Sequence, residues 1–226
     1  MITGGAYVKK KAKKKVLVIC PFPQGVAAGQ RLKYEQYFDH WSENGYEITV
    51  SSFMDMTMWN VVYTRGNYGL KIMGTIRGYL RRLLDIFRVR RFDLVYVCLW
   101  VTPFGTSFFE RLFRQLSRRL IYDIEDNLLM EKGNNLNPFV TLLKSKEKTE
   151  YLIRTADHVI TSSSFLNDYC LKWNLKKACT YISSSVDTDR FFPLKNYTNT
   201  RKVTIGWTGT FSSKLYLDML KDIIYH

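Results

Sequence analysis

Short apolar runs alternate with helical patterns along most of this 226-residue chain, and this alternation constrains the fold more than any other feature. The apolar runs are brief and rich in β-branched and aromatic residues, which is typical of buried strands. The segments between them repeat apolar side chains every three or four positions, as amphipathic helices do. The predicted strands are residues 16–20, 46–52, 92–99, 120–124, 158–161 and 180–183, and the predicted helices are residues 31–44, 72–87, 108–116, 139–156 and 165–173.

The first strand, helix and strand fall within about forty residues, which makes a βαβ unit. Gly45 stands where a helix C-cap is expected, between the predicted helix and the second strand. Because crossovers between parallel strands are right-handed, repetition of this unit predicts a doubly wound, parallel, Rossmann-like α/β domain over residues 14–185. The basic leader, residues 1–13, is expected to be disordered.

The end of the chain predicts the start of a second domain. A polar, Pro-containing stretch, residues 186–201, reads as an interdomain linker. A further apolar run then opens onto the glycine turn Gly206-Trp-Thr-Gly-Thr210. We therefore expect residues 202–226 to be the truncated start of a second α/β domain.

Several classes of protein are disfavoured by composition. The longest apolar run, Leu94–Val101, is well short of the ~20 residues of a membrane-spanning helix, and no signal peptide is evident, so a cytoplasmic location is expected. The four cysteines lack CxxC spacing, which favours reduced, structural thiols. No nucleic-acid-binding motif accompanies the net charge of +14.

Ligands of open α/β sheets bind outside the carboxyl ends of the strands, so the loops there are candidate sites. The loop after the first strand contains Gly25 and Gly29 and leads to Arg31. Its spacing matches neither GxGxxG nor a Walker A motif, so a plain turn remains an alternative to an anion site. In the last loop, Gly206, Gly209 and Thr210 could form a phosphate cradle before a helix.

Three carboxylates, Asp123, Glu125 and Asp126, follow the strand at 120–124. Clustered carboxylates can bind a cation, accept hydrogen bonds from sugar hydroxyls or act as a base. They are equally suited to the start of a helix, where acids are favoured by the helix dipole. The pattern identifies no metal.

Seven short segments follow one another in a characteristic order: 16–23, 30–31, 92–97, 122–127, 156–164, 186–193 and 205–210. In this order they resemble the N-terminal domain of family 4-like glycosyltransferases. The resemblance implies one half of the two-domain GT-B architecture, with retention of anomeric configuration and no metal or other cofactor. It also implies an acceptor site in the N-terminal domain and a nucleotide-sugar donor site in the C-terminal domain.

The resemblance implies roles for individual residues. Gly25, Gly29 and Arg31 match the loop that faces the cleft, and Asp123, Glu125 and Asp126 match an acidic motif at the cleft edge. Gly206, Gly209 and Thr210 match the first loop of the donor domain, near the nucleotide-sugar phosphates. The catalytic residues are unknown and expected beyond His226, and the segment Cys98–Pro103 lacks a histidine that many members have.

A basic amphipathic segment runs from Lys71 to Arg91. Its arginines could hold the protein at the inner face of an anionic membrane. An ordinary helix packed by its apolar face on the sheet is an equally good interpretation. The candidate membrane residues are Arg77, Arg81, Arg82, Arg88, Arg90 and Arg91.

These observations favour part of a retaining glycosyltransferase that moves a sugar from a nucleotide-sugar donor to a glycan or lipid-linked acceptor in surface polysaccharide synthesis. We expect it to be inactive alone. The alternative is a non-catalytic Rossmann-like module that binds a glycan, a membrane surface or a partner subunit. A nicotinamide oxidoreductase ranks third, because the dinucleotide fingerprint is absent.

Overall fold

The computed structural model describes residues 12–125, 146–192, 206 and 220. The chain divides into two compact units, residues 1–187 and residues 188–226. Every described helix and strand belongs to the first unit. The predicted donor-loop residues Gly209 and Thr210, the acid Asp126 and residues 139–145 of the predicted helix 139–156 lie outside the described residues.

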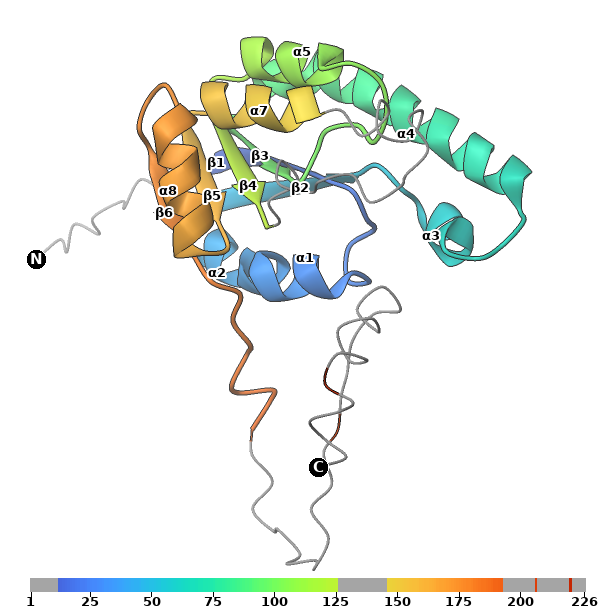
Figure 1. The fold of residues 1–226 in the computed structure, drawn as a ribbon, viewed down its shortest axis with the longest axis horizontal. Helices are drawn as coiled ribbons and strands as arrows, with labels where there is room; N and C mark the ends of the chain where they lie inside the picture. Colours follow the sequence, from blue (N-terminus) through green and yellow to red (C-terminus); the bar gives the residue numbers. More distant parts are fainter. Residues whose placement is uncertain (1–11, 126–145, 193–205, 207–219, 221–226) are drawn as a thin grey trace, which may run out of the picture. The chain divides into compact units, whose positions relative to one another are not determined.

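The first unit is built on a six-stranded sheet in which every pairing is parallel, with the order β2-β1-β3-β4-β5-β6 (Figure 1). This confirms the predicted Rossmann-like α/β fold. The strands are β1 Lys14–Cys20, β2 Tyr46–Ser52, β3 Leu94–Cys98, β4 Leu120–Ile124, β5 His158–Thr161 and β6 Cys179–Tyr181.

Helices cover both faces of the sheet (Figure 1). On one face lie α4 (Tyr68–Arg88), α5 (Phe108–Leu116) and α7 (Lys146–Thr155), with α8 (Ser164–Trp173) packed beside α7. The other face carries α1 (Ala28–Lys33) and α2 (Phe38–Glu43), joined by the 3-10 turn η1 (Glu35–Tyr37). The short α3 (Met56–Val62) contacts α4, and the 3-10 turn η2 (Val89–Arg91) follows α4.

Side chains alternate between the two faces of the sheet, which explains why its strands read as continuous apolar runs. In β1, Leu17 and Ile19 join the core beneath α5 and α7, whereas Val16 and Val18 join the core beneath α1 and α2. All four are at most 2% exposed. The thiols of Cys20, Cys98 and Cys170 are buried, and all four cysteines are free.

The prediction of a single helix over residues 31–44 is wrong. The chain instead forms α1, η1 and α2, and the break lies at Tyr34, whose backbone leaves helical geometry at φ −137° and ψ −29°. The Tyr34 ring is 1% exposed and packs with its centroid 5.3 Å from that of Tyr96. Burial of this large ring against the sheet therefore overrides the helical periodicity.

Helix α4 begins and ends close to where it was predicted, but its apolar face points to solvent. The exposed fractions are 49% for Ile76, 55% for Leu80 and 82% for Phe87. The interpretation in which this face packs on the sheet is therefore wrong. The buried residues of α4 are Gly74, Gly78, Arg82 and Asp85.

Close packing explains the inward glycines of α4. A Cβ added at Gly74 would lie 2.7 Å from the Cβ of Met58, and one at Gly78 would lie 2.6 Å from the ring of Phe53. Both distances are shorter than side chains tolerate, so only glycine lets the helix backbone approach α3 and the end of β2 this closely. Within the described ranges, no helix is both long and apolar enough to cross a membrane.

Candidate functional site

The topological switch point of the sheet lies between β1 and β3, which are neighbours in space but not in sequence. From β1 the chain crosses to β2 by way of α1 and α2 on one face, and from β2 to β3 by way of α4 on the other. Loops that leave neighbouring strands on opposite faces open a crevice at the carboxyl ends. The residues at this carboxyl edge are therefore the first candidates for a ligand site.

The loop after β1 is held by side chains from the helix that follows it. Buried Gln30 accepts a hydrogen bond from the Phe22 amide (3.1 Å) and donates one to the Phe22 carbonyl (3.1 Å). Glu35 accepts a bond from the Gly25 amide (2.9 Å) and another from Gln30 (3.1 Å). Gly25 adopts φ +81°, a left-handed conformation that favours glycine. The loop is therefore fixed before any ligand arrives.

Gly29 and Glu125 come together at this edge. A Cβ added at Gly29 would lie 3.0 Å from Glu125 Oε2, so the missing side chain leaves space for the carboxylate beside α1. The hydroxyl of Ser162, in the loop after β5, donates to the backbone carbonyl of Glu125. Helix α1 and the loops after β4 and β5 therefore meet at Glu125, which is only partly buried.

Asp123 lies within β4 and does not face solvent. Its carboxylate is 1% exposed, with Oδ1 2.6 Å from the ammonium of Lys33 on α1, and Oδ2 accepts a bond from the Tyr96 hydroxyl. Burial raises the pKa of the Asp123 carboxyl above its usual value, although the charge of Lys33 opposes the shift. Because both charged groups are buried between α1 and the sheet, this pair holds the helix on the sheet and is not accessible to a ligand.

The other predicted cleft residues are scattered. Arg31 is exposed on α1, within the helix instead of at its start. Gly206 is exposed in the second unit. Among the described residues, no three His, Cys, Asp or Glu side chains are grouped so that they could hold a metal ion.

Arg82 has no exposed surface, so it cannot contact a lipid as predicted. Its guanidinium donates to the carbonyls of Cys20 (2.9 Å), Ser51 (3.1 Å) and Val101 (2.7 Å). It also bonds Asp85 (3.1 Å), which accepts from Ser51 Oγ (2.5 Å). Arg82 therefore joins the ends of β1 and β2 to the loop after β3, at the carboxyl edge of the sheet.

The loop after β3 has a second buried anchor that the sequence did not reveal. Lys148 on α7 donates to Thr102 O (3.0 Å) and Phe104 O (2.7 Å), and its ammonium lies 3.8 Å from Glu110 Oε1. Glu110 is 0% exposed, and its Oε2 has no hydrogen-bond partner in the described part of the chain. Burial raises the pKa of Glu110 and lowers that of Lys148.

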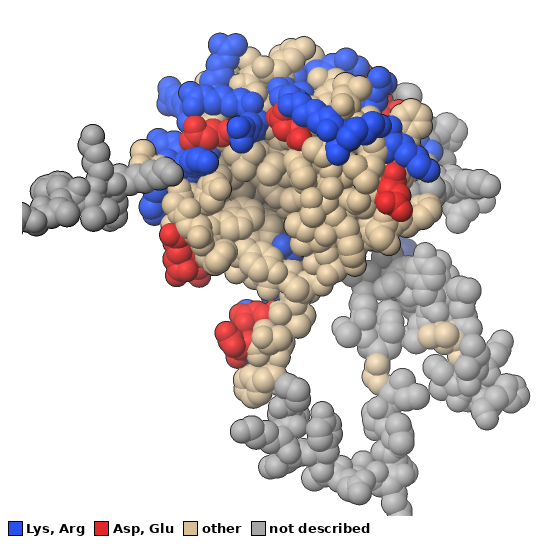
Figure 2. All heavy atoms as spheres, turned by 90° about the vertical axis from the view of Figure 1, so that its left-hand side faces the viewer, with Lys and Arg blue, Asp and Glu red and all other residues tan. Residues whose placement is uncertain are grey.

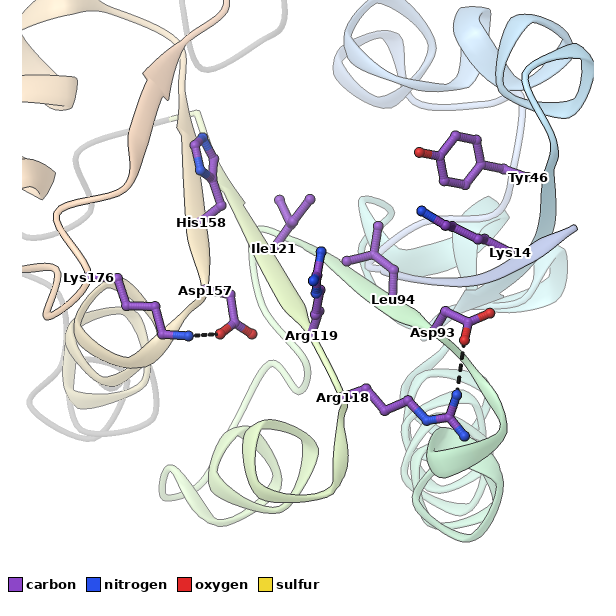
Figure 3. Close-up of a pocket in the computed structure, with 10 residues that line it drawn as sticks. All are labelled: Lys14, Tyr46, Asp93, Leu94, Arg118, Arg119, Ile121, Asp157, His158 and Lys176. Atoms are coloured by element: carbon purple, nitrogen blue, oxygen red, sulfur yellow. Dashed lines mark hydrogen bonds and ion pairs between the residues drawn. The ribbon is translucent and has the colours of Figure 1, made fainter.

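A hollow of about 820 Å³ lies at the opposite, amino-terminal edge of the sheet. Figure 3 shows side chains from the first residues of several strands, including Lys14, Leu94 and His158, around this space. Its two acids are already paired, Asp93 with Arg118 (3.0 Å) and Asp157 with cations that include Lys176. Because doubly wound sheets bind ligands at the carboxyl edge, we assign the candidate site there and not to this hollow.

No protein-family model matches this chain, and a search of curated proteins found no relative. Function is therefore inferred from the fold and from the residues at the carboxyl edge.

Proposed function

We propose that this chain forms the acceptor side of a retaining, nucleotide-sugar-dependent glycosyltransferase that extends a glycan or lipid-linked acceptor. The observation that carries the proposal is the meeting of α1 and the loops after β4 and β5 at Glu125, beside a glycine loop held by Gln30 and Glu35. The parallel sheet is the fold implied by the resemblance of the sequence motifs to family 4-like glycosyltransferases.

A fixed loop and a partly exposed carboxylate suit recognition of a sugar. The Glu125 carboxylate can accept hydrogen bonds from sugar hydroxyls, and Gly25, where a Cβ would have nothing within 4 Å, leaves room for a ring close to the backbone. Acceptor groups held in this way would be oriented toward a donor sugar bound by another domain. Orientation of the two reactants is itself a large part of catalysis in such reactions.

The donor side of the proposal concerns Gly206, Gly209 and Thr210, which we propose contact the phosphates of a nucleotide sugar. Backbone amides of a glycine turn before a helix stabilise a leaving diphosphate without requiring a metal.

Acceptor binding can be measured by saturation-transfer NMR with a panel of glycans and soluble analogues of lipid-linked sugars. We expect at least one acceptor to bind, and Glu125→Gln to weaken its binding by about tenfold, which is about 1.4 kcal/mol. Glu150→Gln is the matched control, because Glu150 is exposed on α7. Equal losses in the two variants, or no binding by any acceptor, would contradict the proposed site.

A transfer assay with the 226-residue chain and a panel of nucleotide sugars tests whether the chain binds acceptor without catalysing transfer by itself. We expect little or no transfer even where an acceptor binds. Robust turnover would show that the chain contains a complete catalytic site and would contradict an acceptor-only role.

A further inference from the structure

Helix α4 presents a continuous apolar stripe to solvent. Its members are between 42% and 82% exposed. They recur every three or four residues over about 21 Å of helix, so they lie on one face. We use the name outer stripe for these residues: Met73, Ile76, Leu80, Leu83, Leu84 and Phe87.

The outer stripe is not needed by the core of the domain. The opposite face of α4 is made of Gly74, Gly78, Arg82 and Asp85, which pack against α3 and the ends of β1 and β2. Six large apolar side chains therefore stay in water although the helix is already fixed by its other face. A contiguous apolar patch of this kind is a sign of an interaction surface.

Cations border the outer stripe. Arg77 follows Met73 by four residues and Arg88 follows Leu84 by four, so each neighbours the stripe on the helix surface. Their side chains are 54% and 41% exposed. Arg90 and Arg91 are exposed in η2, at the end of the helix. The one acid between Lys71 and Arg91 is Asp85, which is buried.

The same helical layer is positively charged beyond α4. In Figure 2, Lys and Arg gather over the side of the molecule that carries α5 and α7, and few of the described residues below this band are Lys or Arg. Anionic lipid headgroups complement an apolar stripe with basic borders, as in amphipathic helices that lie in the plane of a membrane.

We propose that α4 docks on an anionic lipid membrane, with the outer stripe inserted at the level of the headgroups and Arg77, Arg90 and Arg91 at the lipid phosphates. A second copy of the chain fits this surface poorly. In a two-fold dimer the same patch meets itself, which would bring these arginines close to their own equivalents. Membrane docking does not rest on the proposed glycosyl transfer, because vesicle binding requires neither donor nor acceptor.

Vesicle flotation with the full chain tests the insertion. We expect it to float with vesicles of phosphatidylcholine and phosphatidylglycerol, and much less with phosphatidylcholine alone. Phe87→Asp places a charge in the outer stripe and should lower the partition coefficient by more than about tenfold. Phe165→Asp is the matched control, since Phe165 is 62% exposed on α8 and should leave binding unchanged.

The arginines are tested separately from the stripe. Arg77→Gln, Arg90→Gln and Arg91→Gln should each lower binding to the anionic vesicles by about fivefold. Lys172→Gln on α8 is the control, because this exposed lysine lies on a different helix. Thermal unfolding by circular dichroism checks that each variant is folded, which is expected because the changed side chains are exposed.

Three results would overturn the proposal. One is failure of the folded parent chain to float with anionic vesicles. Another is binding that Phe87→Asp leaves intact while the arginine variants lose it, which would indicate a purely electrostatic contact without insertion. The third is a parent that sediments as a dimer, becomes monomeric with Phe87→Asp and ignores vesicles, which would assign the outer stripe to a second copy.

Discussion

Replacing Arg82 with Met should destabilise the domain strongly, although the side chain is charged and lies on a helix whose charged residues are mostly basic. Met keeps a long apolar stem but removes every donor of the guanidinium. The change leaves the carbonyls of Cys20, Ser51 and Val101 without this partner, and it leaves buried Asp85 without one of its two arginines.

The expected magnitude follows from burial. Breaking a buried ion pair by removing one member costs about 3–5 kcal/mol, because the remaining charge stays desolvated. Asp85 keeps bonds from Arg88 (2.6 Å) and Ser51 (2.5 Å), which places the loss toward the lower value. For a domain of this size, a loss of about 3 kcal/mol lowers Tm by roughly 6–12 °C.

Urea unfolding, followed by circular dichroism, measures the effect from the shift in midpoint at constant slope. Arg77→Met is the control, because Arg77 is 54% exposed and its contact with Asp55 is long at 3.6 Å. An exposed pair of this kind contributes at most about 1 kcal/mol. If Arg82→Met cost no more than Arg77→Met, Arg82 would not be the buried anchor described above, and α4 would not pack by this face.

Two further predictions concern the packing of α4 and the buried pair Glu110–Lys148. Gly78→Ala should lower the free energy of unfolding, measured with urea, by about 1–3 kcal/mol because the added Cβ would meet the Phe53 ring. Gly69→Ala is the control, because the space around its added Cβ is open, and it should be neutral or stabilising. Equal effects of the two changes would contradict the close approach of α4 to Phe53. Glu110 has a pKa raised by burial above 4.5, so its contribution is fully present below pH 4.5 and is lost as pH rises through the folded-state value. The free energy of unfolding of the parent chain should therefore fall relative to that of Glu110→Gln as pH rises above 4.5, and a difference that is constant or grows with pH would refute this.

Much of the fold could be predicted from local pattern. Strands buried on both faces stand out as apolar runs, and the crossover rule then fixes their parallel arrangement. The break at Tyr34 could not be predicted, because the periodicity of residues 31–44 is satisfied equally by one helix or by two short ones. Only the packing of the Tyr34 ring against Tyr96 decides between one helix and two.

The candidate site was predictable to the level of loops but not of side chains. Asp123 and Glu125 are two residues apart, so the same alternation applies to both, yet they have different surroundings. Asp123 is still within β4 and is sealed under α1 by Lys33, whereas Glu125 lies just past the strand and reaches the edge near Gly29. The burial of a carboxylate depends on what covers it, and Lys33 is distant in the sequence. The roles of Gln30 and Glu35 were missed although both are near the glycine loop in sequence, because a polar residue in a helical pattern does not reveal which backbone groups it will bond.

The sequence by itself determined the class of fold, because hydrophobic period and turn residues act over a few positions and are visible in one dimension. It also predicted an amphipathic helix over residues 72–87, which lies within α4, Tyr68–Arg88. Which face of that helix meets the sheet was decided only in the tertiary structure. The glycines at 74 and 78 and the pair Arg82–Asp85 recur at helical spacing just as the outer stripe does. Close approach to Met58 and Phe53 and the unsatisfied carbonyls at the strand ends favour the glycine and arginine face, so the larger apolar residues are left outside.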